Sequence, residues 1–319
     1  MSVRSSGRDS KCGAGDAAPT PAQQKGKTNE SASKTNGCDK APRYRAGPGE
    51  AARTGKPMSR LGTTFHESFS LVRSQLAKTL PLAVDAPLSF ARIRDQTDLG
   101  MNYAKAMPRY ADGCGLIDPS TGMLSSFGRR VLEYDPQLET PTTQWLLHYH
   151  MSSPSGPGPA YWHRAICERL RPGHSTTADK MRSDIPELSG LADRTARTAI
   201  SVLIGTYTKH ECLGPLGLLE RSREGIEVRE PGSPPIAAIA FALSHAWRGS
   251  WPDLSVVPLD AFHTPGGFAS VLYLTPESLE DSLLQLSQQG IVELWRTAPP
   301  FQVVRKWTDP DALADLLHA

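Results

Sequence analysis

The sequence predicts a mainly α-helical α+β protein with small β-hairpins, in which tandem units resembling winged helix-turn-helix domains follow a disordered N-terminal tail. Three observations support this fold class. Residues 1–60 have almost no aliphatic side chains, helical periodicity begins near Phe65, and short helices followed by a turn between apolar segments recur three times. The predicted divisions are a tail (1–60), a first unit (63–134), a helical connector (135–158), a second unit (159–232) and a third unit (233–319).

The tail holds most of the basic excess of the chain. Residues 1–60 contain 12 Lys and Arg against 5 Asp and Glu, whereas residues 61–319 contain 23 against 28. With so few aliphatic residues, the tail cannot bury enough apolar surface to offset the entropy cost of ordering. Two interpretations stay open: the tail contacts phosphates and speeds association with nucleic acid, or it is a leader with no role.

Composition also bears on the compartment. No run of eighteen apolar residues occurs, and the N-terminus lacks the apolar centre of a secretory signal, so we expect a cytoplasmic protein. The cysteines form no C-x-x-C pair and are odd in number, which favours reduced thiols and argues against a structural zinc site. They are Cys12, Cys38, Cys114, Cys167 and Cys212.

The first unit has the element order of a helix-turn-helix. Its first helix is predicted from apolar residues at three- and four-residue steps: Phe69, Val72, Leu76 and Leu80. Pro87 opens a second short helix, and Gly100 precedes a third. The segment GLIDPSTGMLS then places a Pro-containing turn between two apolar pieces, as the hairpin wing of a winged helix would.

The third helix of this unit is the predicted recognition helix. Its apolar face carries Tyr103, Ala106, Met107 and Tyr110. Asn102, Lys105 and Arg109 share the opposite face. Asn and Arg can contact base edges, whereas Lys105 would meet phosphate. The alternative is an ordinary solvated face. Pro108 lacks an N–H, so we expect a kink or a later helix start there.

The pattern returns in the second unit. Helices are expected over 161–170 and 175–185, and Asp193 is expected to cap a third helix. The outward residues Arg194 and Arg197 of that helix are a second predicted set of DNA contacts. The segment GLLERSREGIEVRE alternates around a glycine and predicts another hairpin.

The connector and the third unit complete the predicted fold. Two helices are expected over the string FGRRVLEYDPQLETPTTQWLLHYHM, which leads into the connector, with breaks at Asp135–Pro136 and again near Pro141. The third unit is expected to contain a helix over 236–247, a helix starting at Thr275, and strands in IVELWRT and FQVVRKW. The outward face of its last helix is acidic, so phosphate would be repelled and packing against protein is predicted. That face carries Glu277, Glu280, Asp281 and Gln285.

No strong catalytic motif is present. The sequence lacks a phosphate-cradling Gly-rich loop with Lys and Ser/Thr, and it lacks a G-x-S-x-G elbow. His66 and Glu67, in FHESF, are the candidate catalytic pair, because histidine titrates near neutrality and a carboxylate can orient it or hold a divalent metal. The alternative is that both residues cap the first helix. His148 and His150 are two residues apart and cannot chelate one ion from a helix, so each is interpreted as a packed or a surface histidine near Trp145.

Several strings in combination resemble one bacterial family. They are FHESF, LGMNYAKAMPRYADGCGLID, SSFGRRVLEYDPQLETPTTQWLLHYHM and RTARTAISVLIGTYT. Together they resemble the SspB-like family of domains of unknown function encoded in DNA phosphorothioate modification islands. The resemblance runs from about Thr63 to the C-terminus. Phe65 stands where the first motif of the family has a glycine.

This resemblance implies a DNA-binding component of a phosphorothioate modification and antiphage defence system. Such a component would nick one strand of double-stranded DNA, with Mg²⁺ or Mn²⁺, so that partner enzymes can insert sulfur in the backbone. The implied partners are a cysteine desulfurase, a PAPS-reductase-like enzyme and an ATPase. On this reading His66 and Glu67 would act in cleavage. The alternatives are a non-catalytic DNA-binding adaptor and a transcriptional regulator.

The tail analysis generates a first prediction. Deletion of residues 1–56 should leave the melting temperature unchanged and weaken DNA binding, most visibly at low salt, because the deleted segment adds charge but no apolar burial. Differential scanning calorimetry and a salt titration of binding measure the two effects. A large loss of thermal stability would show that the tail packs on the fold.

Overall fold

The computed structural model describes residues 61–297 and 299–318, which belong to one compact unit. The predicted tail lies outside the described residues. The structure is a mixed α+β fold with two small antiparallel sheets, in agreement with the coarse fold class. No helix among the described residues is long and apolar enough to cross a membrane. The three cysteines in this part of the chain, Cys114, Cys167 and Cys212, are free.

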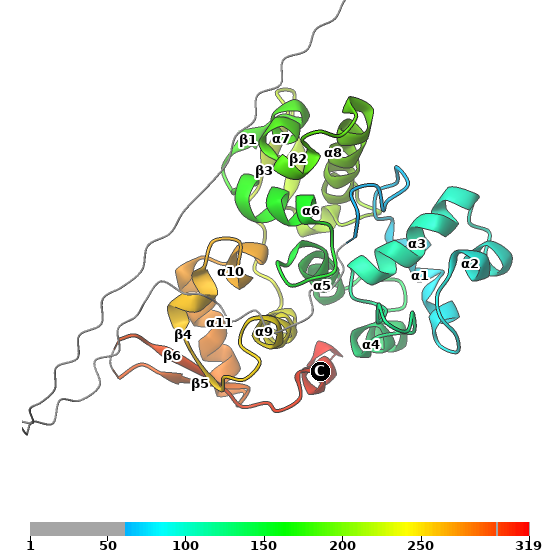
Figure 1. The fold of residues 1–319 in the computed structure, drawn as a ribbon. Coiled ribbons are helices and arrows are strands. Elements are labelled where there is room, and N and C mark those ends of the chain that lie inside the picture. The colour runs from blue at the N-terminus through cyan, green and yellow to red at the C-terminus, as the bar shows by residue number, and fades with distance from the viewer. Residues whose placement is uncertain (1–60, 298, 319) are drawn as a thin grey trace, which may run out of the picture. The chain divides into compact units, whose positions relative to one another are not determined.

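Helices dominate the first half of the described chain (Figure 1). They are α1 (Arg73–Ala77), α2 (Phe90–Gln96), α3 (Met101–Gly113), α4 (Ser126–Tyr134), α5 (Pro141–Ser152), α6 (Ala160–Arg164), α7 (Ala178–Asp184) and α8 (Asp193–Thr208). A 3₁₀ turn follows α1 at Leu80–Ala83, a π turn follows α6 at Ala165–Arg169, and further 3₁₀ turns lie at Pro186–Leu188 and Gly214–Leu216.

The strands form two sheets, and all of them except β1 follow α8 in the sequence. Strands β1 (Ser175–Thr176), β2 (Leu219–Arg221) and β3 (Ile226–Val228) form one sheet in the order β1-β3-β2, with Leu219 opposite Val228. Strands β4 (Val256–Pro258), β5 (Val292–Trp295) and β6 (Gln302–Arg305) form the other in the order β4-β6-β5, with Val292 opposite Arg305. The α-helices after α8 are α9 (Ile236–Ser250), α10 (Phe268–Val271) and α11 (Pro276–Gln288), and 3₁₀ helices lie at Leu259–His263 and Pro310–His318 (η6).

Most predicted elements form, with corrected boundaries. The first helix begins only at Arg73, and the second begins at Phe90, where the Ser89 hydroxyl accepts from the Arg92 amide. Helix α3 starts at Met101 and continues past Pro108, so the expected late start is wrong. Residues 175–176 form strand β1 instead of the start of a helix, because the Thr177 side chain caps α7. Asp193 is the first residue of α8, and Ala192 holds the cap position.

The predicted wings are hairpins of different extent. The first is a single antiparallel bridge between Ile117 and Leu124, closed by a turn in which Gly122 has φ +70°. The second is the β2–β3 pair, which a third strand extends. The assignment of either hairpin as a winged-helix wing stays a prediction.

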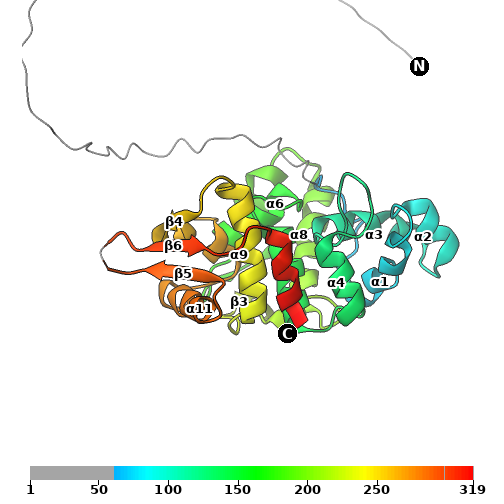
Figure 2. The ribbon, with the colours of Figure 1, turned by 90° about the horizontal axis from the view of Figure 1, so that it is seen from below.

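Helix α5 is a central element of the fold. It lies in the segment that the sequence analysis describes as a helical connector between two units. Every residue from Thr143 to Ser152 is buried, and the helix packs against α6 and α9. In Figure 1 it lies between α6 and α9, with α3 and α4 beside it. Figure 2 shows the C-terminal helix η6 between α9 and α4, and η6 packs against both. Helix α5 is thus buried on every side although half of its residues are polar, so its polar side chains need partners in the interior.

A buried polar network holds α5 in place. The Tyr207 hydroxyl on α8 accepts from Trp162 Nε1 at 3.0 Å and donates to His148 Nδ1 at 2.8 Å. His148 Nε2 lies 2.7 Å from the Val271 carbonyl and donates to it. Of the two interpretations, packed or surface, the structure has His148 packed. Because burial lowers the pKa of His148 to about 4, its imidazole is neutral at pH 7.

Arg73 forms a second buried polar cluster. Its side chain is 8% exposed, and its guanidinium donates to the carbonyls of Leu138, His210 and Cys212 at 2.7–2.9 Å. A buried charge needs such hydrogen bonds to offset its lost hydration. Arg73 thereby joins α1 to the loop before α5 and to the loop after α8.

Replacement of Tyr207 by Phe should lower the free energy of unfolding by about 1–3 kcal/mol, because the Trp162 N–H and His148 Nδ1 would both lose their partner in the interior. Urea denaturation measures this loss. The control is Tyr134→Phe, since Tyr134 is 50% exposed on α4 and its substitution should cost less than about 0.5 kcal/mol. Equal midpoints for both variants would contradict a structural role for the network.

Candidate nucleic-acid interface

The exposed face of α3 has the predicted arrangement. Asn102, Lys105 and Arg109 are exposed, whereas Ala106 and Tyr110 are buried in the core. Tyr110 also fixes the helix to the preceding segment, because its hydroxyl donates to the Phe69 carbonyl at 2.6 Å. The side chains of Asn102 and Lys105 have no hydrogen-bond or ion-pair partner within the described part of the chain. Two polar groups are therefore available to a ligand on this face.

His66 and Glu67 lie in a chain of turns and do not cap a helix. Helix α1 begins six residues after Glu67, so both the expected position at a helix start and the alternative capping role are wrong. Backbone hydrogen bonds within residues 62–69 close these turns. Glu67 and Ser68 have φ values of +46° and +72°, a left-handed conformation that non-glycine residues adopt only at a cost. Strain of this kind is often concentrated at functional sites.

Arg109 connects this turn to the α3 face. Its Nη1 atom lies 2.7 Å from Glu67 Oε1 and 3.3 Å from the Phe65 carbonyl oxygen. The side chains of Arg109 and Glu67 are 45% and 30% exposed, so water reaches the pair. The structure thus brings together the predicted catalytic residue Glu67 and the predicted DNA contact Arg109.

His66 is far less accessible than a catalytic base would require. It is 3% exposed, and its Nδ1 accepts a hydrogen bond from the Ser68 amide at 2.9 Å. Burial lowers the pKa of His66 to about 4, against the attraction of the Glu67 carboxylate, which raises it. The imidazole is neutral at pH 7 and cannot contribute positive charge near a phosphate. Direct contact with DNA would require the turn to open.

Phe65 explains part of this burial. Its ring packs edge-on against Tyr110 with centroids 4.9 Å apart, and it also contacts Trp162 and His66. The aromatic side chain at the position where the family motif has glycine therefore attaches the turn to the core. Close approach of a ligand to the backbone is blocked at this position.

The second predicted set of contacts is separate from this site. Arg194 and Arg197 are exposed on α8, as expected. Arg197 Nε lies 2.8 Å from the Asp193 carboxylate, which Arg182 also contacts. Arg194 has no side-chain partner in residues 61–297 and 299–318. Of the two, Arg194 is thus the more available to phosphate.

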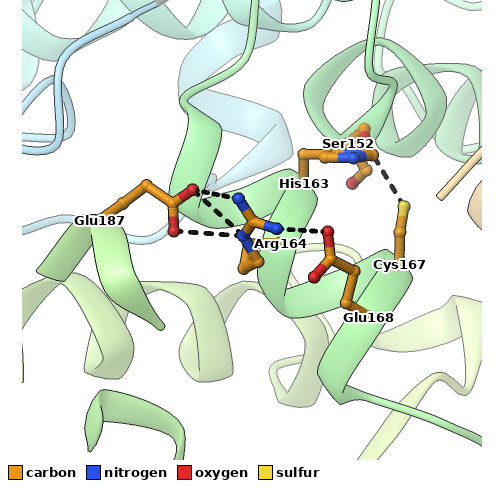
Figure 3. Close-up of polar contacts among 6 residues, drawn as sticks. All are labelled: Ser152, His163, Arg164, Cys167, Glu168 and Glu187. Carbon is orange, nitrogen blue, oxygen red and sulfur yellow. Dashed lines mark hydrogen bonds and ion pairs between the residues drawn. The ribbon is translucent and has the colours of Figure 1, made fainter. Parts of the chain in front are cut away.

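A further basic side chain near α8 is neutralised by its neighbours. Figure 3 shows the Arg164 guanidinium between the carboxylates of Glu187 and Glu168. Arg164 Nη1 lies 2.6 Å from Glu168, and its Nη2 lies 3.0 Å from Glu187. Two negative charges outweigh one positive charge, so this cluster does not suit a phosphate. The same view shows Cys167 directed towards Ser152, whose carbonyl its thiol contacts at 3.7 Å.

Metal-ligating side chains are sparse at this site. The described residues contain no group of three or more His, Cys, Asp and Glu side chains that could hold a metal ion. Glu67 is already bound to Arg109, and His66 is buried.

The pKa of His66 offers a direct test of this geometry. NMR titration of its ring protons should give a midpoint near pH 4, and Glu67→Gln should move the midpoint lower, because the carboxylate that raises the pKa is lost. Since the unfolded value is 6.5, the unfolded state takes up the proton first, and stability should fall as the pH drops from about 6.5 to about 4. Glu133→Gln, on α4, is the control. A midpoint near 6.5 would show a solvated imidazole.

Comparisons with known proteins were made for the whole chain. No curated protein matches it. Among solved structures, a crystal structure of magnesium ion-bound SspB is similar, with a TM-score of 0.67 and 18% identity over 82% of this chain and 87% of that chain. A second SspB crystal structure gives a TM-score of 0.66 and 17% identity, over 82% of this chain and 88% of that one. These similarities establish a shared fold and confirm the predicted family resemblance. The model of a family described as protein of unknown function (DUF4007) matches residues 64–318, and the chain is a member of that family.

Proposed function

We propose that this protein is the DNA-binding component of a bacterial DNA phosphorothioate modification system, where it acts on duplex DNA. The observation that carries the proposal is the position of Arg109. This residue joins an exposed polar helix face to a strained turn that carries a carboxylate. The shared fold with the SspB structures supports the choice of system.

In this proposal the α3 face lies against the duplex. Lys105 contacts phosphate as a point charge, while Asn102 and Arg109 reach base edges or the backbone. Arg194 on α8 is a further proposed phosphate contact, and Arg197 is a weaker one because Asp193 neutralises it. The partners are the sulfur-transfer enzymes of the same system, namely a cysteine desulfurase, a PAPS-reductase-like enzyme and an ATPase.

Strand nicking is the first candidate activity at this site. Glu67 is the carboxylate proposed to contact Mg²⁺ or Mn²⁺, because Mg²⁺ often binds through one or two carboxylates together with substrate phosphates. Its attachment to Arg109 would have to be exchanged for the metal. His66 would serve as a neutral base once the turn opens.

A non-catalytic adaptor is the second candidate. Two observations favour it: His66 is 3% exposed, and no group of three metal-ligating side chains occurs in the described residues. An adaptor would use the same α3 face and recruit the sulfur-transfer enzymes without cutting DNA.

DNA binding is tested by Lys105→Ala and Arg109→Ala. Each should weaken duplex binding, and each lost phosphate contact should reduce the salt slope by about one unit. Lys306→Ala is the matched control, since Lys306 is exposed to a similar degree and lies next to β6. Identical salt titrations for the double variant and the parent would show that α3 does not face DNA.

Nicking is tested with supercoiled plasmid, Mg²⁺ or Mn²⁺, and the partner enzymes. The parent should convert the plasmid to the open circular form, whereas His66→Ala and Glu67→Ala should bind the plasmid but leave it supercoiled. Binding without nicking by the parent under both metals would favour the adaptor.

A further inference from the structure

A cavity of about 830 Å³ lies apart from the residues assigned above. It is bordered by the ends of α3, α5 and α9, the start of α4 and the hairpin that contains Ile117. This volume falls in the range of small-molecule sites, about 300–1,000 Å³. Its rim is open to solvent, because Pro119, Thr121 and Arg248 are exposed. None of the residues proposed to contact DNA lines it.

Three polar atoms at the cavity have no hydrogen-bond partner in the described structure. They are Asp112 Oδ1, His150 Nε2 and His245 Nε2. His150 is 6% exposed. An unpaired buried polar atom costs about 1–3 kcal/mol, so a group of three around one cavity indicates a missing partner. The three residues come from the separate helices α3, α5 and α9, so no local motif in the sequence marks the group.

The polarity of two of these atoms is fixed. Arg248 Nη2 lies 2.9 Å from His245 Nδ1, and a guanidinium can only donate. Burial holds the pKa of His245 well below its usual range, so the ring is neutral and its proton is on Nε2. Burial raises the pKa of Asp112 to about 6, which leaves its carboxylate ionised at pH 7.5. The cavity therefore presents a donor at His245 and an acceptor at Asp112.

The inner wall of the cavity is aromatic. Phe127, His150 and His245 line it. The rings of Phe127 and His150 are 5.4 Å apart and tilted by 32°, and Phe241, which does not line the cavity, packs against His245 at 4.5 Å. Gly115 allows the hairpin to approach this wall, since a Cβ atom there would lie 2.6 Å from the His150 ring. Flat π surfaces of this kind favour a planar ligand.

We infer that this cavity binds a nucleobase, with its hydrogen-bonding edge on Asp112 and His245 and its ring against the aromatic wall. A heterocyclic base carries donors and acceptors on one edge, as this pair requires. A phosphate alone carries only acceptors and would face the Asp112 carboxylate. The inference rests on the proposed function, because the nucleobase would come from a nucleotide turned out of the stack of a DNA duplex. A free nucleotide has the same chemistry and is the other source.

The rim suits the phosphate of such a nucleotide. Ser126 and Phe127 are the first residues of α4, and both line the cavity. The leading amides of a helix have no acceptor within the helix and favour an anion. Arg248 adds a positive charge, which is shared at 3.6 Å with Asp311.

The test measures binding to three DNA duplexes. The first is fully matched, the second carries one bulged base, and the third carries a bulged abasic site. The parent should bind the bulged base about tenfold more tightly than the abasic bulge, the difference expected for one hydrogen bond to a charged group. Asp112→Asn should abolish this preference without lowering the melting temperature, because Oδ1 has no partner to lose. Asp281→Asn, an exposed acid on α11, should keep the preference.

A second arm measures binding of dAMP, dGMP, dCMP and dTMP by calorimetry. One outcome is that the parent binds free nucleotides, that Asp112→Asn weakens this binding, and that neither protein binds a duplex. This outcome would support the cavity as a nucleobase site and overturn the proposed function. Equal binding of the base and abasic bulges, with no nucleotide binding, would overturn the inference and show that the cavity holds water only. Duplex binding through α3 would then stand alone.

Discussion

The hydroxyl group of Tyr207 is the interaction on which the arrangement of this fold depends. It links α8 to Trp162 on α6 and to His148 on α5, and His148 continues the chain to the backbone of α10. Each of these helices comes from a different part of the sequence. Each donor in this series of hydrogen bonds meets an acceptor, so the network has one arrangement. That arrangement fixes the positions of the helices and of the apolar side chains packed around them.

This network also explains the limits of prediction from the sequence. Helices α3 and α8 were predicted with the correct faces, because each alternates between core and solvent at helical spacing. The two larger hairpins were predicted from strands on either side of a turn. Helix α5 carries no such alternation, since it is buried on every side, and the sequence therefore suggested only a connector. Strand β4 pairs with β6, which is distant in the sequence, so no local hairpin pattern marks it.

The candidate site was predicted in part. The exposure of Lys105 and Arg109 followed from the helix pattern. The pairing of Arg109 with Glu67 did not, because it joins residues 42 positions apart. Burial of His66 likewise depends on Phe65, whose packing against Tyr110 and Trp162 is a tertiary contact. The unpartnered atoms of the cavity have no local signal in the sequence at all.

The Arg73 cluster has a consequence for synthesis of the protein. The three carbonyl groups that accept hydrogen bonds from its guanidinium include that of Cys212, about 140 residues further along the chain. While the ribosome is still translating the segment up to His210 and Cys212, the guanidinium lacks two of its three carbonyls, so its buried charge is only partly compensated. Helix α1 is therefore made well before two of the carbonyl groups that secure it, and its final position depends on residues that leave the ribosome much later.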